Sequence, residues 1–323
     1  MLAGTYDEQV VINKSLTLEG AGDTTIVKPS SADKLTTRLR VVGPYHPHYE
    51  TREFAGIIVA DSASDVTVKN LKVDGASIAA LPSGTYAVVG ILYCESGGTI
   101  DKVTVDHLLG VKSLSVYLSA KSETVSVEVK NSTLINFKKN GLDACGDHLT
   151  ANIHDNIVTG QGSYGDEVQN GIVVAIGTEA TVDDNAISAM YSPGVDYDAI
   201  AITFASSHGS ADNNTITDCE CGIRGRDSSF SAEGNTITLT GTETGYSGLE
   251  ARNYGANYFG GGTGHRDGDW TVSFVNNTVT GTWGQGVGIG CKNTALETSS
   301  LTVILDGNYF TGSGSEVGYP EDR

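Results

Sequence analysis

The sequence predicts an all-β solenoid, in which short strands repeat along one axis and stack coil on coil. Three observations predict it: a recurring asparagine, a recurring run of alternating apolar residues, and a composition that includes 41 glycines in 323 residues. Glycine and asparagine favour tight turns, and the abundant valine and threonine favour strands. Repeats of about 20–50 residues are typical of solenoids, because no single unit can bury its apolar face alone.

The first repeated phrase ends in an asparagine followed by an apolar or small residue. Its members are Asn70, Asn131, Asn156, Asn185, Asn214, Asn235, Asn277 and Asn308, with His107 in this place in one segment. Asparagine tolerates the left-handed backbone of a tight turn, and its amide both donates and accepts hydrogen bonds. We therefore predict an asparagine ladder. Asn131 begins an Asn-X-Ser/Thr sequon but, as a ladder residue, should be unavailable for glycosylation.

The second phrase is a strand with alternating apolar positions, as in "GIVVA" from Gly171 and "GLEAR" from Gly248. Successive side chains of a strand face opposite sides, so alignment of these phrases separates inward from outward residues. The predicted inward column is Ile57, Ile91, Val116, Leu142, Ile172, Ile200, Ile223, Leu249 and Val287. The predicted outward column is Ile58, Leu92, Tyr117, Asp143, Val173, Ala201, Arg224, Glu250 and Gly288.

Together with the opening "GTYDEQVVINKSLTLEGAG", these repeats resemble the pectate-lyase-like superfamily of right-handed parallel β-helices, in its secreted and cell-surface branch. The resemblance extends from about residue 4 to 314 and implies a single domain over 1–323 of about ten coils. Loop insertions, the longest at 28–55 and 253–270, would flank the first-strand face. Such proteins usually carry a cap before the first coil, and we expect that the cap and a secretory signal have been removed.

Bulk composition excludes several function classes. The 39 acidic and 20 basic residues leave a net charge of −19, which argues against a nucleic acid or an anionic membrane as partner. No apolar run is long enough to span a membrane. The resemblance instead implies an extracellular or cell-surface location. Five cysteines form an odd and sparse set, so we predict small buried residues and no disulfide framework.

Positive charge is concentrated at one place on the predicted outward face. Arg224 and Arg226 are outward positions of one strand, and Glu250 and Arg252 occupy the same positions one coil later, about 4.8 Å away. Paired hydrogen bonds from these arginines can hold a carboxylate or sulfate of an acidic glycan. The alternative is a surface ion-pair network with no ligand.

Three residues are predicted to be catalytic: Glu250, Asp143 and Arg224. Glycoside hydrolysis by two carboxylates needs them about 5–10 Å apart, whereas Asp143 and Glu250 are separated by about 19 Å along the axis. Pairs with Asp147 or Asp227 are the nearer options. Asp143 can also be a solvated turn residue without any catalytic role. The resemblance carries over no catalytic residues, because the paired aspartates of galacturonases and the Asp-Pro-His signature of alginate epimerases are not seen.

The insertions are rich in aromatic residues, which suit the apolar faces of sugar rings. The residues predicted to bind substrate are Arg226, Arg252, Tyr117, Tyr254, Trp270 and Tyr191. Acidic stretches at 165–168 and 196–198 can hold Ca²⁺ together with backbone carbonyls, although neither matches a known calcium loop. No other metal or cofactor is predicted.

These observations predict a polysaccharide-active β-helix that cleaves an acidic glycan, as a lyase or a glycoside hydrolase, in a groove over the first-strand face. The alternative is a non-catalytic cell-surface or adhesion domain that binds glycan or protein. The strong negative charge and the sparse catalytic residues favour this alternative.

Overall fold

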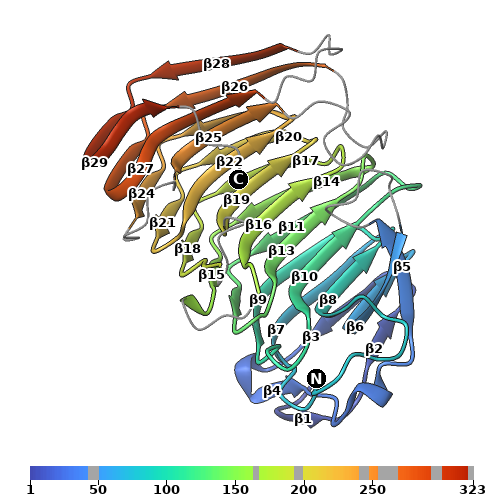
Figure 1. The fold of residues 1–323 in the computed structure, drawn as a ribbon. Helices are drawn as coiled ribbons and strands as arrows, with labels where there is room; N and C mark the ends of the chain where they lie inside the picture. The colour runs from blue at the N-terminus through green and yellow to red at the C-terminus, as the bar shows by residue number, and fades with distance from the viewer. Residues whose placement is uncertain are drawn as a thin grey trace.

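The structure is a computed structural model, and it describes residues 1–42, 51–162, 167–192, 199–239, 247–253, 268–291 and 300–318. Strands stack along one axis from the N-terminal end to the C-terminal end and form an elongated solenoid (Figure 1). Strands of successive coils pair in parallel, as a solenoid of β-coils requires. The predicted all-β parallel fold is therefore confirmed.

Three parallel ladders form the walls of the solenoid. The first ladder contains β2 (Val10–Ile12), β6 (Thr51–Asp61), β8 (Ala87–Cys94), β10 (Ser113–Ser119), β13 (Asn140–Cys145), β16 (Asn170–Ala175), β19 (Ile200–Ala205), β22 (Cys221–Arg226), β25 (Ser247–Asn253) and the later parts of β27 (Thr278–Cys291) and β29 (Tyr309–Gly318). Its strands carry six of the predicted site residues: Tyr117, Asp143, Arg224, Arg226, Glu250 and Arg252.

The second ladder contains β3 (Leu16–Glu19), the first parts of β7 (Val66–Asp74) and β9 (Gly98–Asp106), β11 (Val125–Lys130), β14 (Leu149–His154), β17 (Glu179–Asp183), β20 (His208–Asp212), β23 (Ser229–Glu233), β26 (Asp269–Val275) and β28 (Ser300–Asp306). The third contains β1 (Gly4–Tyr6), β4 (Thr25–Val27), the later parts of β7 and β9, β12 (Thr133–Ile135), β15 (Ile157–Thr159), β18 (Ala186–Ser188), β21 (Thr215–Thr217), β24 (Thr236–Leu239) and the first parts of β27 and β29.

The predicted insertion at 28–55 contains regular structure. After the 3₁₀ turn η1 (Gly22–Thr24) and β4, the chain forms a second 3₁₀ turn, η2 (Ala32–Lys34), and then β5 (Arg38–Val42). β5 pairs antiparallel with the first half of β6. The insertion therefore adds an antiparallel edge to the first ladder beside the N-terminal coils (Figure 1).

Inward side chains of the three ladders form one continuous apolar core. Within it, the rings of Phe204 and Phe230 stack at 4.6 Å between centroids, and Phe274 meets Phe230 edge-on at 5.8 Å. The Phe204–Phe230 contact joins the first ladder to the second, and the Phe230–Phe274 contact joins two neighbouring coils of the second ladder. As predicted, the cysteines whose side chains the structure describes are free and buried: Cys94, Cys145, Cys219 and Cys221. None of the helical turns in the described segments has the length and apolar character of a membrane-spanning helix.

The predicted alignment of the first ladder is wrong at two strands. Ile58, and not Ile57, pairs with Ile91, because the uninterrupted apolar run of β6 has no polar residue that marks its outward face. In β19, Ile202, and not Ile200, pairs with Ile172. Ile202 and Thr203 keep their predicted faces, whereas Ala201, predicted to face outward, belongs to the core, and Ile200, predicted to face inward, does not.

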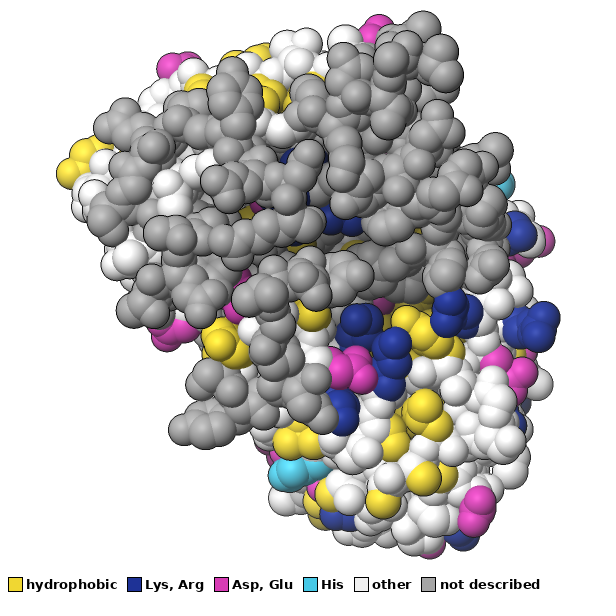
Figure 2. Space-filling model, in the orientation of Figure 1, with side chains coloured by type: hydrophobic (Ala, Val, Ile, Leu, Met, Phe, Trp, Pro, Cys, Tyr) yellow, Lys and Arg dark blue, Asp and Glu magenta, His cyan; other side chains and the backbone are white. Residues whose placement is uncertain are grey.

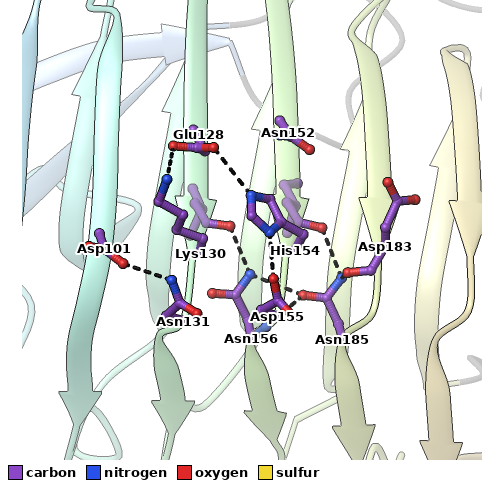
Figure 3. Close-up of polar contacts among 12 residues, drawn as sticks. Asp101, Glu128, Lys130, Asn131, Asn152, His154, Asp155, Asn156, Asp183 and Asn185 are labelled. Carbon is purple, nitrogen blue, oxygen red and sulfur yellow. Dashed lines mark hydrogen bonds and ion pairs between the residues drawn. The ribbon is translucent and has the colours of Figure 1, made fainter.

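The asparagine ladder exists, and its hydrogen bonds link successive coils. Its members are Asn156, Asn185, Asn214, Asn235, Asn277 and Asn308. From Asn185 onward, each amide oxygen accepts two bonds from the asparagine one coil earlier, as where Asn185 Oδ1 accepts from the backbone N and from Nδ2 of Asn156, both at 3.0 Å (Figure 3). Each described step therefore satisfies buried backbone and side-chain groups together.

Three predicted ladder members are wrong. Asn70 and Asn131 instead occupy the preceding turn position, with φ of 53° and 51°, and Ser132 takes the place of the ladder asparagine. His107 lies in a different left-handed turn. Two properties suit asparagine to this turn: it tolerates a left-handed backbone, and its amide forms hydrogen bonds between coils. One residue of the turn uses the first property, and the next residue uses the second. Asn131 is exposed and donates to Asp101 Oδ1 at 2.9 Å (Figure 3), so the expectation that Asn131 is unavailable as a ladder residue is also wrong.

Replacement of a ladder asparagine should destabilise the fold strongly. Asn214 is fully buried, accepts two bonds from Asn185 and donates to Val182 O and Asn235 Oδ1. We expect Asn214→Ala to lower the free energy of unfolding by about 3 kcal/mol, because buried partners lose their bonds. Asn213→Gly, at the exposed left-handed neighbour, should change it by less than about 0.5 kcal/mol. Equal effects in denaturant titrations would contradict this account of the ladder.

Candidate functional site

The register of the first ladder brings the predicted outward residues into one column. This column is Val59, Leu92, Tyr117, Asp143, Val173, Thr203, Arg224, Glu250 and Gly288. It corrects the predicted column at two places, where Val59 replaces Ile58 and Thr203 replaces Ala201. Every residue in it is buried.

An apolar layer covers the outward face of the N-terminal coils. Leu92, Tyr117 and Val173 belong to a second buried cluster, separate from the core, together with Val41 of β5 and Phe54 of β6. The rings of Phe54 and Tyr117 lie 4.8 Å apart between centroids. The antiparallel edge formed by β5 and β6 therefore supplies apolar partners to side chains that the sequence predicts to line a groove.

Asp143 is a fully buried carboxyl group in this layer. Asn140 Nδ2 donates to both of its oxygens, at 2.8 and 3.0 Å. Burial raises the pKa of Asp143 to about 7, against the opposing effects of the Asn140 hydrogen bond and of Lys139. Asn170 Nδ2 donates to Asn140 Oδ1 at 3.0 Å, so a short polar row runs through the apolar layer. Asp143 is therefore not the solvated turn aspartate of the alternative prediction.

Tyr117, predicted to bind substrate, is fully buried beside Asp143. Its hydroxyl and the thiol of Cys145 share a hydrogen bond, and burial raises the pKa of both groups well above their ordinary values. Tyr117 is therefore part of the apolar layer, where its ring contacts Phe54.

The second polar group on the outward face is the arginine centre, which we define as Arg224, Arg226, Glu250 and Arg252. Glu250 is 0% exposed, and the side chains of Arg224 and Arg252 are 4% and 12% exposed. Arg224 Nε donates to Glu250 Oε2 at 2.5 Å, and Arg252 Nε pairs with Glu250 Oε1. Arg226 is half-buried and pairs in register with Arg252. The predicted cluster is thus assembled as the sequence indicates.

Glu250 compensates the charge of the two guanidinium groups that flank it, of which Arg224 is buried and Arg252 is half-buried. A buried charge is costly unless an opposite charge and hydrogen bonds accompany it, and here each carboxylate oxygen faces one guanidinium nitrogen. The arrangement orients Arg224 and Arg252, whose planar guanidinium groups carry five N–H donors each and suit a carboxylate or sulfate. Glu250 is therefore better placed as a positioning residue than in the proton-transfer role predicted for it.

The two carboxyl centres are far apart. Four coil steps separate Asp143 from Glu250 along the column, which corresponds to about 19 Å. Of the nearer options, Asp147 is exposed beyond the end of β13, whereas Asp227 is buried and its backbone N donates to Arg252 O at 2.9 Å. Asp227 is thus the buried carboxyl group that the backbone brings next to the arginine centre.

Two buried side chains, which the sequence analysis did not single out, hold the bases of the upstream insertions. Glu220 accepts from the backbone N of Ser192 and of Ala199, both at 2.8 Å, and so ties together the two ends of the segment between them. Gln169 accepts from Gln161 N at 2.7 Å and acts in the same way one coil earlier. No sequence motif marks either residue, because their partners are backbone groups.

The remaining predicted site residues do not gather at the arginine centre. Trp270 lies at the start of β26, on the second ladder, where it is 5% exposed and 6.2 Å from His208 between ring centroids. Tyr191 is half-buried, and its carbonyl accepts from Gln169 N at 3.3 Å. Tyr254 lies outside the described residues, as do most of the acidic stretches suggested for Ca²⁺. No group of three metal-ligating side chains occurs within the described segments.

Removal of the Asp143 charge should change how stability depends on pH. Burial raises the pKa from 3.8 to about 7, so the stability that this carboxyl contributes is complete below about pH 4 and is lost as the pH rises through about 7. A shift of about three pKa units corresponds to about 4 kcal/mol. The free energy of unfolding of Asp143→Asn minus that of the wild type should therefore increase by up to about 4 kcal/mol across this range.

Denaturant titrations between pH 4 and 8 measure this difference. Asp147→Asn, an exposed carboxyl group in the following turn, serves as the matched control and should show a much smaller change. A constant difference between Asp143→Asn and the wild type at every pH would contradict the effect of burial.

Removal of the Glu250 charge should destabilise the protein. Glu250→Gln leaves the buried Arg224 and the half-buried Arg252 without the charge of Glu250, and it turns an amide N–H₂ toward an N–H donor. We expect a loss of about 3–5 kcal/mol in the free energy of unfolding. Glu233→Gln, at an exposed position of β23, should cost less than about 0.5 kcal/mol. A loss below about 1 kcal/mol for Glu250→Gln would show that the ion pairs are weak.

Comparison with known proteins supports the fold. No protein-family model matches the chain, and no curated protein matches it significantly. It is similar in structure to the GH136 lacto-N-biosidase of Eubacterium ramulus, with a TM-score of 0.55 and 9% identity over 97% of this chain and 60% of that chain. For the tailspike of Pseudomonas phage phi297 the TM-score is 0.53, with 10% identity over 98% and 66%.

The catalytic domain of a GH87 α-1,3-glucanase, solved in complex with tetrasaccharides, is similar with a TM-score of 0.50 and 14% identity over 95% of this chain and 53% of that chain. This chain thus spans between about half and two thirds of the length of these three structures. At such low identity the likeness shows the fold alone. This chain has a right-handed parallel β-helix fold.

Proposed function

We propose that this chain binds an acidic polysaccharide over the outward face of its first ladder and cleaves it at the arginine centre by β-elimination. The observation that carries the proposal is the position of Arg224, Arg226 and Arg252 at outward sites of adjacent strands around one buried glutamate. Such polysaccharides occur outside cells, so the proposal places the protein in the extracellular space or at the cell surface.

Charge supports an acidic ligand. The chain carries a net charge of −19, yet three arginines surround one carboxylate at this point of the outward face. Guanidinium groups recognise carboxylates and sulfates through paired N–H···O bonds. The lacto-N-biosidase and the tetrasaccharide-bound α-1,3-glucanase are carbohydrate-active proteins with this fold, which supports a glycan as the ligand class.

The arginine centre suits β-elimination from a uronate. Hydrogen bonds from Arg224 or Arg252 to the uronate carboxylate would stabilise the negative charge that develops when the neighbouring C5–H bond breaks. A base takes the C5 proton, and the electron pair of the broken C5–H bond forms a C4=C5 double bond. The C4–O glycosidic bond breaks at the same time, and its oxygen takes up a proton as it leaves. The arginines therefore supply electrostatic stabilisation in this proposal.

Geometry makes hydrolysis by the predicted carboxylates less favourable. Two-carboxylate glycosidases need their carboxyl groups about 5–10 Å apart, whereas Asp143 and Glu250 are separated by four coil steps. Asp143 is also fully buried under the apolar layer. A lyase is accordingly the better of the two predicted reaction classes.

A non-catalytic glycan-binding domain is the second candidate. It is favoured by the complete burial of Glu250, whose two oxygens both face arginines, and by the distance of Asp143 from that centre. In this role the arginine centre holds an anionic sugar without any chemistry. The two candidates share one ligand class and differ in whether products form.

A panel of acidic and neutral polysaccharides tests the proposal. Wild-type protein should produce unsaturated ends from an acidic glycan, seen as the ultraviolet absorbance of the new double bond. Arg224→Ala should lower this rate by about 100-fold or more, the cost of removing one preorganised donor. Arg226→Ala leaves the contacts of Glu250 with Arg224 and Arg252 in place and should also lower the rate. Lys121→Ala, an exposed site after β10, is the control and should match the wild type.

Other outcomes decide between the alternatives. Reducing ends that form without ultraviolet absorbance would show hydrolysis and would contradict the lyase. Binding of an acidic glycan without products, lost in the arginine variants, would establish the non-catalytic domain. Absence of both binding and cleavage across the panel would overturn the proposed function.

A further inference from the structure

A buried hydroxyl group lies next to the arginine centre on the outward face of the first ladder. It belongs to Thr203 of β19, which pairs in register with Arg224 one coil later, at the strand spacing of about 4.8 Å. Thr203 is 4% exposed, and its Oγ1 atom has no hydrogen-bond partner within the part of the chain that the structure describes. Buried polar groups nearly always have a partner, so this hydroxyl group needs an explanation.

The neighbours of Thr203 on the outward face offer its hydroxyl group no bond. Val173, one coil earlier in the column, is apolar, and Ala205, the next outward residue of β19, has only a methyl group. On the other side, the Nε atom of Arg224 donates to Glu250 Oε2, on the coil beyond, at 2.5 Å. A threonine hydroxyl can donate one hydrogen bond and accept two. Thr203 therefore lies between the apolar layer and the arginine centre with this capacity unused.

The stability of the fold does not explain a threonine at this place. Thr178, which is 0% exposed, shows the usual arrangement, because its Oγ1 atom lies 2.8 Å from Ala175 O and 3.1 Å from Gly146 O. At position 203 a valine would have nearly the same shape without an unpaired polar group, whose burial is unfavourable. A hydroxyl group that the free protein leaves unpaired points to a partner in a ligand.

The other end of the arginine centre is closely packed. Gly288 follows Glu250 in the outward column, one coil later. A Cβ atom added at Gly288 would lie 2.9 Å from both Gln285 Oε1 and Ser247 Oγ. Since even a methyl group does not fit there without a shift of its neighbours, a sugar cannot reach this depth beyond Glu250. The unused hydrogen-bonding capacity lies on the opposite side, at Thr203.

Charge alone does not distinguish a glycan from another polyanion. Figure 2 shows Lys and Arg side chains beside Asp and Glu side chains on the face in view, and guanidinium groups bind carboxylates of many molecules. A hydrogen bond to a substrate hydroxyl discriminates more strongly, because an analogue without that hydroxyl leaves a buried protein group unpaired. Thr203 is placed to supply the selectivity that the arginines lack.

We propose that Thr203 is a substrate-binding residue, whose hydroxyl group forms a hydrogen bond with a sugar hydroxyl on the N-terminal side of the anionic group held by Arg224. The inference rests on the proposed function. It adds that the ligand is a glycan with a free hydroxyl group close to its anionic group, and not a polyanion in general. Thr203 takes no part in bond breaking and serves to orient the sugar ring.

Binding of polygalacturonate, alginate, hyaluronate and polyacrylate tests this role, because all four polymers carry carboxylates but polyacrylate has no hydroxyl groups. Thr203→Val should bind the glycans that the wild type binds about three- to tenfold more weakly, since one hydrogen bond is lost. Its affinity for polyacrylate should match that of the wild type. Arg224→Ala should weaken the binding of both kinds of polymer. Thr203→Ser keeps the hydroxyl group and should bind the glycans as the wild type does.

Denaturant titrations separate a ligand-binding hydroxyl group from a structural one. The unfolding midpoint of Thr203→Val should equal or exceed that of the wild type, because the free protein loses no hydrogen bond. Thr178→Val is the matched control, since it removes a hydroxyl group that has acceptors in the protein. It should lower the unfolding midpoint and leave glycan binding unchanged.

Three results would overturn this role of Thr203: unchanged glycan binding by Thr203→Val, a lower unfolding midpoint of this variant, or equal weakening of its binding to glycan and polyacrylate. If Thr203→Val binds normally while Arg224→Ala does not, the proposed function stands and only the role of Thr203 fails. If the wild type binds none of the three glycans, the proposed function fails, and the role of Thr203 fails with it.

Discussion

Parallel pairing of each coil with the next is the constraint on which the other features depend. The asparagine ladder reinforces this pairing, because each amide bonds both the backbone and the side chain of the preceding ladder residue. A fixed register converts a sequence separation of 26 residues into adjacency, and so brings Arg224 directly beside Glu250. Sites on a solenoid are thus built along the axis from single positions of successive coils.

The two buried carboxyl groups of the outward column, Glu250 and Asp143, lie in different surroundings. Glu250 faces two guanidinium groups, whereas Asp143 receives hydrogen bonds from one neutral amide and lies among apolar side chains. Charge compensation stabilises the first group as a carboxylate, and burial raises the pKa of the second to about 7. The difference supports the anion-holding role proposed for the coils around Glu250, and it gives the coils around Asp143 a packing role.

The sequence predicts the fold and the arginine centre because both follow from alternation along strands. It does not separate the left-handed turn residue from the ladder residue, since asparagine suits both positions, and Asn131 is consequently misplaced. It also does not reveal that Asp143 is buried, because Val41 and Phe54 come from a segment about ninety residues earlier. The role of Glu220 cannot be predicted from the sequence, because its hydrogen-bond partners are backbone groups whose positions depend on the path of a loop.

The central claim is that the arginine centre holds the anionic group of a glycan. A crystal structure of the protein with a short uronate oligosaccharide tests it most directly. The account predicts that a carboxylate of the sugar lies within hydrogen-bond distance of the guanidinium groups of Arg224 or Arg252, with the chain of sugars along the solenoid axis. An oligosaccharide that binds on another ladder, or that turns only its hydroxyl groups toward these arginines, would contradict the account.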